Sequence, residues 1–93
     1  ASTVVSNRFQ HMNIKKTLSL KQPEVGNFIR ELRTLTGLTQ EELAAHLGVT
    51  FPTVNRWENG RNKPSKMAMR QLEKMLIDMG NSGQELLTKY MAS

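Results

Sequence analysis

One segment decides the fold of this 93-residue chain: Thr39-Gln-Glu-Glu-Leu-Ala-Ala-His-Leu-Gly-Val-Thr-Phe-Pro-Thr-Val-Asn-Arg-Trp-Glu-Asn-Gly60. Apolar side chains at helical spacing define two short faces within it: Leu43, Ala44 and Leu47, then Val54 and Trp57. Gly48 falls between the two faces, where a tight turn needs a residue that adopts a positive φ. The segment therefore predicts two short amphipathic helices joined by a turn of three or four residues.

This pattern is typical of the helix-turn-helix, in which the second helix enters the major groove of DNA. The length of the chain indicates one domain. The chain contains no cysteine, and this absence excludes a disulfide framework and a thiolate metal site. Neither a membrane-spanning run of roughly 20 apolar residues nor a signal peptide is visible. We therefore expect a soluble cytoplasmic protein.

The formal net charge of +5 is unevenly distributed. Residues 1–21 contain four basic side chains and no acidic one. In residues 51–74, basic side chains outnumber the acidic Glu58 and Glu73; they are Arg56, Arg61, Lys63, Lys66, Arg70 and Lys74. A positive field around the second helix of the pair is typical of a surface that binds a polyanion.

Residues 1–22 have no helical period and predict a flexible basic arm. Its charged side chains after residue 11 are Lys15, Lys16 and Lys21. Such an arm either follows a DNA backbone or enters a minor groove, or it is a disordered terminus without a role. The pair His11-Met12 is typical of a cloning junction, so residues 1–11 are either vector-derived or native.

The first expected helix begins at Pro23, which loses no useful hydrogen bond at the first helical position. It ends at Gly37, a typical residue just past a helix end. Its apolar stripe repeats at spacings of three and four: Val25, Phe28, Ile29, Leu32 and Leu35.

The two helices of the central pair have their own N-terminal signals. Thr39 and Glu42 form a capping box ahead of a helix over 40–47. Thr50 is the N-cap of a helix over 51–58.

Ser65 is the expected N-cap of a longer helix over about 66–79, which Gly80 ends. Its expected core residues are Ala68, Leu72, Met75 and Met79, together with Met67. Ser82 and Glu85 predict a second capping box ahead of a short last helix. That helix is expected to supply a dimer contact through Leu86, Leu87, Tyr90 and Met91.

Five helices and no strand signal predict an all-α fold. The expected parts are an arm over 1–22, a helix-turn-helix domain over 23–80 and a C-terminal helix within 81–93.

The segment from about Phe28 to Met79 resembles the lambda-repressor/Cro-type helix-turn-helix family, also seen in xenobiotic-response-element regulators. The matching positions are Gln40, Ala44, Gly48, Val54, the block Trp57-Glu58-Asn59-Gly60, Arg61 and Pro64. The resemblance implies a compact five-helix DNA-binding domain. It also implies a transcriptional repressor or regulator, often dimeric on inverted repeats.

Helical geometry indicates which residues of 51–58 face the groove. At 100° per residue, Val54, Trp57 and part of Glu58 point inward. The residues expected to contact bases are Phe51, Pro52, Asn55 and Arg56. Arginine can donate two hydrogen bonds to guanine, asparagine can pair with adenine, and Phe51 can touch a thymine methyl. The alternative for Asn55 and Arg56 is an ordinary solvated side chain.

A second set is expected to contact phosphates. Gln40 lies at a helix N-terminus, where unpaired amides and the helix dipole favour an anion. In the family, the loop after the recognition helix follows the backbone of DNA. The full set is Gln40, Thr53, Asn59, Gly60 (through its amide), Arg61 and Lys63. These contacts fix register and carry no sequence information.

The resemblance also implies an ion pair, because members of the family often pair an arginine and a glutamate at the positions of Arg33 and Glu58. A partly buried pair of this kind would orient the recognition helix rather than add net stability. The alternative is two unrelated surface charges.

No catalytic or metal-binding pattern is visible. His46 is alone on the outward face of its helix, and no nucleophile–base pair or glycine-rich phosphate loop accompanies it. We expect no enzyme, no cofactor, no small-molecule substrate and no membrane partner. Double-stranded DNA is the expected partner, with a homodimer as a further expectation. Two alternatives stay open: an antitoxin that binds a toxin protein and represses its own operon, and a DNA-targeting fragment of a larger protein.

Overall fold

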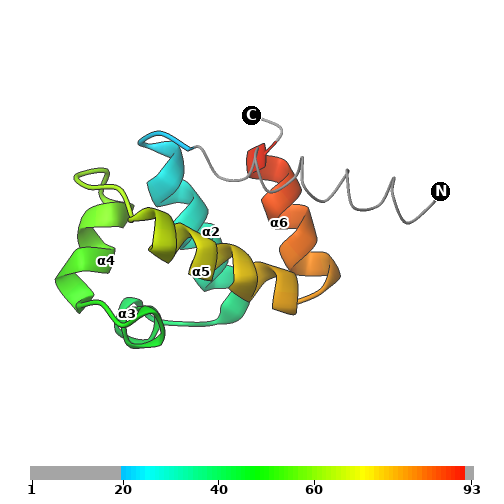
Figure 1. The fold of residues 1–93 in the computed structure, drawn as a ribbon, viewed down its shortest axis with the longest axis horizontal. Helices are drawn as coiled ribbons and strands as arrows, with labels where there is room; N and C mark the ends of the chain where they lie inside the picture. Colours follow the sequence, from blue (N-terminus) through cyan, green and yellow to red (C-terminus); the bar gives the residue numbers. More distant parts are fainter. Residues whose placement is uncertain (1–19, 92–93) are drawn as a thin grey trace.

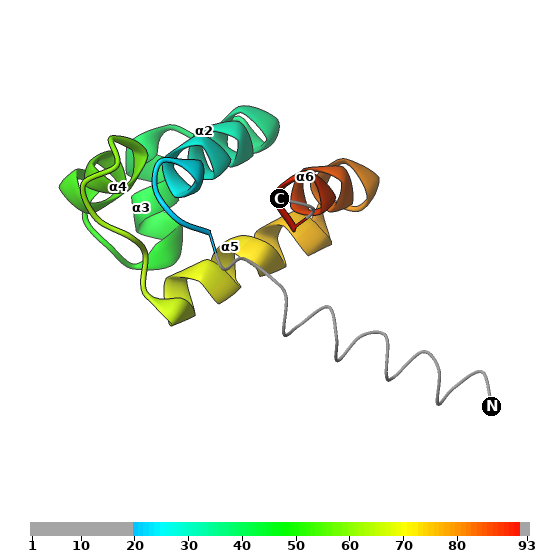
Figure 2. The ribbon, with the colours of Figure 1, turned by 90° about the horizontal axis from the view of Figure 1, so that it is seen from above.

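The computed structural model describes residues 20–91, which form five α-helices and no strand. The helices are α2 (Glu24–Thr36), α3 (Gln40–Leu47), α4 (Phe51–Glu58), α5 (Lys66–Asp78) and α6 (Asn81–Met91). The pair α3–α4 lies at one end of the molecule and α6 at the other, with α2 between them and α5 crossing from one end to the other (Figures 1 and 2). The expected all-α, five-helix fold is confirmed. Most of the predicted arm, including His11, Lys15 and Lys16, lies outside the described residues.

One apolar core joins the five helices. The core residues are Leu20, Val25, Phe28, Ile29, Leu32, Leu43, Ala44, Leu47, Val54, Trp57, Ala68, Leu72, Leu76, Leu86, Leu87 and Tyr90. Phe28 of α2 and Tyr90 of α6 pack edge to face, with ring centroids 5.2 Å apart. The core therefore includes α6, whose apolar residues pack within the chain.

Local signals in the sequence set most helix ends. The capping box of α3 is complete: Glu42 N–H donates to Thr39 Oγ1 at 3.0 Å, and Thr39 N–H donates to Glu42 Oε1 at 2.9 Å. Gly48 ends α3 with a φ of 73°, which a residue with a side chain rarely adopts. Thr50 and Ser65 are the N-caps of α4 and α5, as predicted.

The last helix begins earlier than predicted. α6 starts at Asn81, so Ser82 and Glu85 both lie inside it and the capping box between them is wrong. Only Met79 and Gly80 separate α5 from α6. Gly83 then packs directly on the α5 backbone, because a Cβ there would lie 1.8 Å from Leu76 O. This tight reversal forces the chain into α6 upstream of the predicted start.

The predicted core positions of two methionines are also wrong. The buried stripe of α5 is Ala68, Leu72 and Leu76. Met67 is 72% exposed and Met79 38% exposed, whereas Met75 packs against the core edge. Because the stripe repeats every four residues from Ala68, Met67 falls on the outer side and Met79 falls after the end of the helix.

The described fold begins before α2, at residues that the sequence assigned to the arm. Leu20 is buried in the core. The Gln22 side chain donates to Trp57 O at 3.1 Å and to Asn62 O at 2.7 Å, and it accepts from Gly26 N–H at 3.1 Å. Residues 20–22 therefore belong to the folded domain.

Candidate nucleic-acid interface

The helix α4 has a buried face and an exposed face. Its buried residues are Val54, Trp57 and Glu58, the three that helical geometry places inward. Phe51, Pro52, Arg56 and Asn59 are exposed, and Thr53 and Asn55 are half-buried. The four residues predicted to contact bases therefore share one helix, and three of them are open to solvent.

The residues predicted to contact phosphates flank this exposed face. Gln40 is the first residue of α3, and Asn59 follows the last residue of α4. Arg61 and Lys63 are exposed in the loop between α4 and α5. The Gly60 amide is already used within the chain, because it donates to Trp57 O at 3.2 Å. Any phosphate contact here therefore falls to the side chains around Gly60.

Arg33 and Glu58 form the ion pair that the resemblance implies. Arg33 Nε donates to Glu58 Oε2 at 2.6 Å, and Arg33 Nη2 donates to Glu58 Oε1 at 3.0 Å. Two parallel hydrogen bonds of this kind fix the orientation of both groups. Arg33 also donates to Leu38 O at 3.2 Å. The pair thereby connects α2, the turn after it and the end of α4.

The Glu58 carboxylate is charged although it is buried. Burial alone raises its pKa, but hydrogen bonds from Arg33 and Gln40 outweigh this effect, so the pKa lies below its ordinary value. The hydrogen bonds between Arg33 and Glu58 also raise the pKa of Arg33. Arg30 adds a second positive charge, with its Nε 3.6 Å from Glu58 Oε1. Glu58 is therefore a fixed negative charge between α2, α3 and α4.

A chain of three side-chain amides extends from Glu58 to the protein surface. Gln40 Nε2 donates to Glu58 Oε1 at 3.0 Å, and Asn55 Nδ2 donates to Gln40 Oε1 at 3.2 Å. Asn59 Nδ2 donates to Asn55 Oδ1 at 3.0 Å, and Arg30 Nη2 donates to Asn59 Oδ1 at 3.3 Å. We call Gln40, Asn55 and Asn59 the amide chain. It joins two residues predicted to contact phosphates with one predicted to contact a base.

Sequence reasoning missed three residues that position this surface. Arg30 lies one turn before Arg33 on α2, a spacing that could have indicated its shared partner. Gln22 holds the loop after α4 through two backbone carbonyls. Gly26 lets α2 touch the end of α4, since a Cβ there would lie 2.6 Å from Glu58 O. No local pattern distinguishes Gln22 or Gly26 from ordinary helix-start residues.

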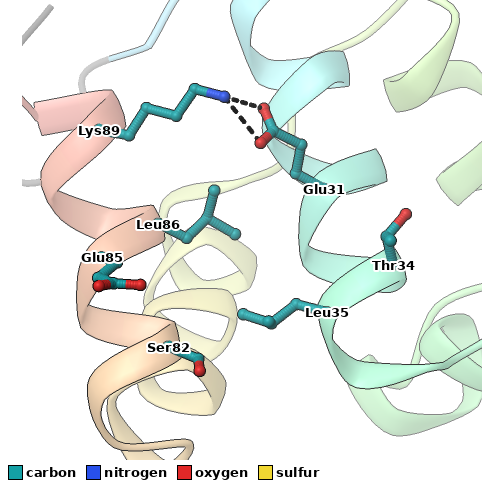
Figure 3. Close-up of a pocket in the computed structure, with 7 residues that line it drawn as sticks. All are labelled: Glu31, Thr34, Leu35, Ser82, Glu85, Leu86 and Lys89. Carbon is teal, nitrogen blue, oxygen red and sulfur yellow. Dashed lines mark hydrogen bonds and ion pairs between the residues drawn. The ribbon is translucent and has the colours of Figure 1, made fainter.

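A separate groove of about 370 Å³ lies between α2 and α6 (Figure 3). Leu35 and Leu86 point into it from opposite sides, and the Lys89 ammonium bridges both oxygens of Glu31 at one end (Figure 3). Tyr90 OH also donates to Glu31. These polar contacts fasten α6 to α2 at the opposite end of the molecule from α3 and α4.

Neither a membrane-spanning helix nor a cluster of metal-ligating side chains is present among the described residues. Within residues 20–91, no helix has the length and apolar character needed to span a bilayer. The same part of the chain contains no group of three or more His, Cys, Asp or Glu side chains placed to hold a metal ion.

Comparison with known proteins identifies the family. Residues 29–76, just over half of the chain, match the profile of a helix-turn-helix family of the Cro/C1 type. The match includes all of α3 and α4 and most of α5. The chain therefore belongs to this helix-turn-helix family, whose members bind DNA as transcriptional regulators.

Curated relatives carry names consistent with this family. The HTH-type transcriptional activator BcrR of Enterococcus faecalis is 35% identical over 68 residues, which are 70% of this chain and 33% of that protein. An uncharacterised HTH-type transcriptional regulator of Methanothermobacter thermautotrophicus is 46% identical over 48 residues, 52% of this chain and 70% of that protein. An uncharacterised transcriptional regulator in the ATPase CF(0) region of Rhodospirillum rubrum is 34% identical over 61 residues, 66% of this chain and 56% of that protein.

The similarity is confined to part of the longer relatives. This chain spans about a third of the length of BcrR and 37% of the length of an uncharacterised regulator of Sinorhizobium medicae. No solved structure matches the chain significantly.

Proposed function

We propose that the protein binds a specific double-stranded DNA sequence with α4 in the major groove and regulates transcription from that site. The observation that carries the proposal is the division of α4 into a buried face and an exposed face of base-recognising residue types. Phe51, Pro52 and Arg56 are exposed, whereas Val54 and Trp57 fix the helix in the core. The family match and the relatives' names support the same conclusion.

Arg56 and Asn55 are the proposed sequence-recognising residues. An arginine can donate two hydrogen bonds to O6 and N7 of guanine, and an asparagine can pair with N6 and N7 of adenine. The Phe51 side chain is 45% exposed at the first position of α4 and can pack on a thymine methyl. Pro52 follows it on the exposed face.

Phosphate contacts are proposed on both sides of α4. The candidates are Gln40, Thr53, Asn59, Arg61 and Lys63, with Gly60 allowing close approach of the backbone. Asn59, Arg61 and Lys63 are exposed, so their side chains can reach a phosphate without disturbing the core. Such contacts set the position of the protein on the duplex and make binding dependent on salt.

A random-duplex selection tests the proposal. The 93-residue protein is mixed with a library of random DNA duplexes, and the retained fraction is sequenced. We expect an enriched motif, and we expect Arg56→Ala to lose base preference at one position of it. The loss should correspond to about 1–3 kcal/mol of discrimination at that position.

Arg61→Ala and Lys74→Ala are the matched comparison. Arg61→Ala should weaken binding about equally for all sequences and lower the salt slope by about 1. Lys74 is exposed in the third turn of α5 and is not among the residues proposed to contact DNA, so its substitution should change binding less. Retention without an enriched motif, lost steeply as salt rises, would contradict sequence-specific recognition.

The same selection tests whether two copies bind together. We propose a homodimer on an inverted repeat, whose half-sites would lie about 34–36 Å apart on one face of the duplex. Leu86, Leu87 and Tyr90 are buried within the chain, so a dimer contact would have to use other residues than those three. Enrichment of a single half-site would contradict the dimer.

None of the relatives named above is called an antitoxin, so a toxin partner is not part of this proposal.

A further inference from the structure

The amide chain of Gln40, Asn55 and Asn59 has one fixed direction of hydrogen bonding. An amide side chain can ordinarily rotate by half a turn and exchange its donor with its acceptor. Here both ends of the chain are occupied by groups that cannot exchange. The Glu58 carboxylate only accepts, and the Arg30 guanidinium only donates.

These two ends determine every amide between them. Because Glu58 accepts from Gln40, the Gln40 nitrogen faces Glu58 and its oxygen faces Asn55. Asn55 must then present its nitrogen to Gln40 and its oxygen to Asn59. Rotation of any one amide would place two acceptors or two donors against each other at about 3 Å, so the chain resists rotation as a unit.

The chain leaves part of Asn55 available. Its amide nitrogen has two hydrogens and its oxygen two lone pairs. One of each is used by Gln40 and Asn59, so one donor and one acceptor remain in a fixed order on a half-buried side chain. The major-groove edge of adenine presents an acceptor at N7 and a donor at N6, and an asparagine with this order can bind both.

We infer that Gln40 and Asn59 are positioning residues that fix the amide of Asn55 in one orientation and thereby make it selective for adenine. The inference rests on the proposed function, because it needs α4 in the major groove. It couples two kinds of contact, since the side chains proposed to touch phosphates also orient a side chain proposed to touch a base. Loss of Gln40 or Asn59 should therefore blur one base position as well as weaken binding.

The test compares Gln40→Met, Asn59→Ala and the wild-type protein in the random-duplex selection. Each enriched site is then measured with adenine replaced by 7-deazaadenine, which lacks the N7 acceptor, at the position assigned to Asn55. The wild type should bind the site with 7-deazaadenine roughly 5- to 100-fold more weakly than the site with adenine. Each variant loses one of the two hydrogen bonds that orient the Asn55 amide, so this fold loss should be smaller than in the wild type, while discrimination at the Arg56 position stays unchanged.

Gln84→Met is the matched control, because Gln84 is exposed in α6 and takes no part in the amide chain. This variant should show the same fold loss on replacement of adenine by 7-deazaadenine as the wild type, at every position. Gln40 and Asn59 lie at helix ends, and the helical content and melting of each variant establish that it is folded. Asn59→Ala breaks the chain from its exposed end and so tests the inference independently of Gln40.

The outcomes separate the inference from the proposed function. An enriched motif whose adenine preference is the same in the wild type, Gln40→Met and Asn59→Ala would overturn the inference and leave sequence-specific binding intact. The inference would also be overturned, with sequence-specific binding intact, if Asn55→Ala removed no adenine preference from any position of the enriched motif. A wild-type protein that enriches no motif would overturn both.

Discussion

At the scale of single residues, Glu58 connects α4 to two other helices. It is buried to 5% exposure, and it accepts hydrogen bonds from two helices besides its own. Its partners Arg33 and Gln40 come from α2 and α3, so one carboxylate fixes three elements relative to each other. A buried ion pair of this kind roughly balances its own desolvation, so its main effect is geometric.

Removal of the charge at Glu58 should be costly although the shape is kept. Glu58→Gln would leave Arg33 without a carboxylate and would place an amide N–H₂ against a donor. We expect a loss of about 1–3 kcal/mol in the free energy of unfolding, the range for hydrogen bonds to charged groups. Urea unfolding measures it. Glu85→Gln, an exposed change in α6, should be nearly neutral, and equal stability of the two variants would contradict the role of Glu58.

At the scale of helices, two glycines set how closely the elements approach. Gly26 brings α2 against the carboxyl end of α4, and Gly83 brings α6 against α5. Neither glycine has a positive φ, so neither is required by its own backbone conformation. Each is required because another backbone occupies the space where a Cβ would be.

Gly83→Ala provides the clearest test of such an approach. In an isolated helix, alanine is more favourable than glycine by about 1 kcal/mol. Here the new Cβ would lie 1.8 Å from Leu76 O, so α6 must shift away from α5. We expect a net loss of about 1–3 kcal/mol in unfolding free energy, typical of overpacking. Ser82→Ala, exposed at the preceding position, should not destabilise; a Gly83→Ala protein more stable than wild type would contradict the close packing.

The hydrogen bonds of Gln22 lead to a second prediction at this scale. Its side chain holds Trp57 O and Asn62 O, which bracket the loop that carries Arg61. Gln22→Ala should cost about 1–3 kcal/mol, since these two hydrogen bonds and the one accepted from Gly26 N–H are lost, and should speed amide hydrogen exchange of Gly60 and Arg61. Gln71→Ala, at an exposed site in α5, is the control. Unchanged exchange in the loop of Gln22→Ala would show that the bridge does not restrain it.

The limits of prediction from sequence follow the same division between local and tertiary contacts. Thr39 with Glu42, Thr50 and Ser65 were predicted correctly because a cap and its partner lie within one turn of chain. The pair Ser82 and Glu85 had the same pattern and failed, because the tight turn at Gly80 and the close packing of α6 on α5 fixed the helix start instead.

The site shows the same contrast. The residue types on the exposed face of α4 were predictable from helical periodicity. The amide chain was not, because it depends on the distance between α3 and α4 in space and on Arg30, which is far from Asn59 in sequence. Met67 was misassigned because spacing alone does not determine which of two adjacent faces of α5 points inward.

At the scale of the whole molecule, carboxylates with opposite shifts govern the response to acid. Hydrogen bonds from Lys89 and Tyr90 lower the pKa of Glu31, and those to Glu58 lower its pKa despite burial. Burial raises the pKa of Glu73, partly offset by Arg70. The stability from Glu31 and Glu58 is present above their ordinary pKa of 4.5 and is lost as the pH falls through their lower folded values. Glu73 has the opposite sign: its contribution is present below 4.5 and is lost as the pH rises through its higher folded value.

We expect the protein to be less stable at pH 3 than at pH 7, because the contributions of Glu31 and Glu58 are lost as the pH falls and only that of Glu73 is gained. Glu31→Gln should lose less stability over this range than the wild type, and Glu73→Gln should lose more. Urea unfolding at the two pH values measures both variants. A wild-type protein equally stable at pH 3 and pH 7 would contradict the balance of these carboxylates.

The two faces of α4 also have an evolutionary consequence. Val54, Trp57 and Glu58 are buried, and changes among them disturb folding, whereas Phe51, Pro52 and Arg56 are exposed. Mutations at the exposed positions can accumulate without unfolding the protein. A duplicated copy of the gene could therefore acquire a different target site through a few substitutions while inheriting an intact scaffold. Under the proposed function, this separation makes binding preference an evolvable trait, and it marks positions 51, 52 and 56 as the ones to randomise when the protein is redirected by engineering.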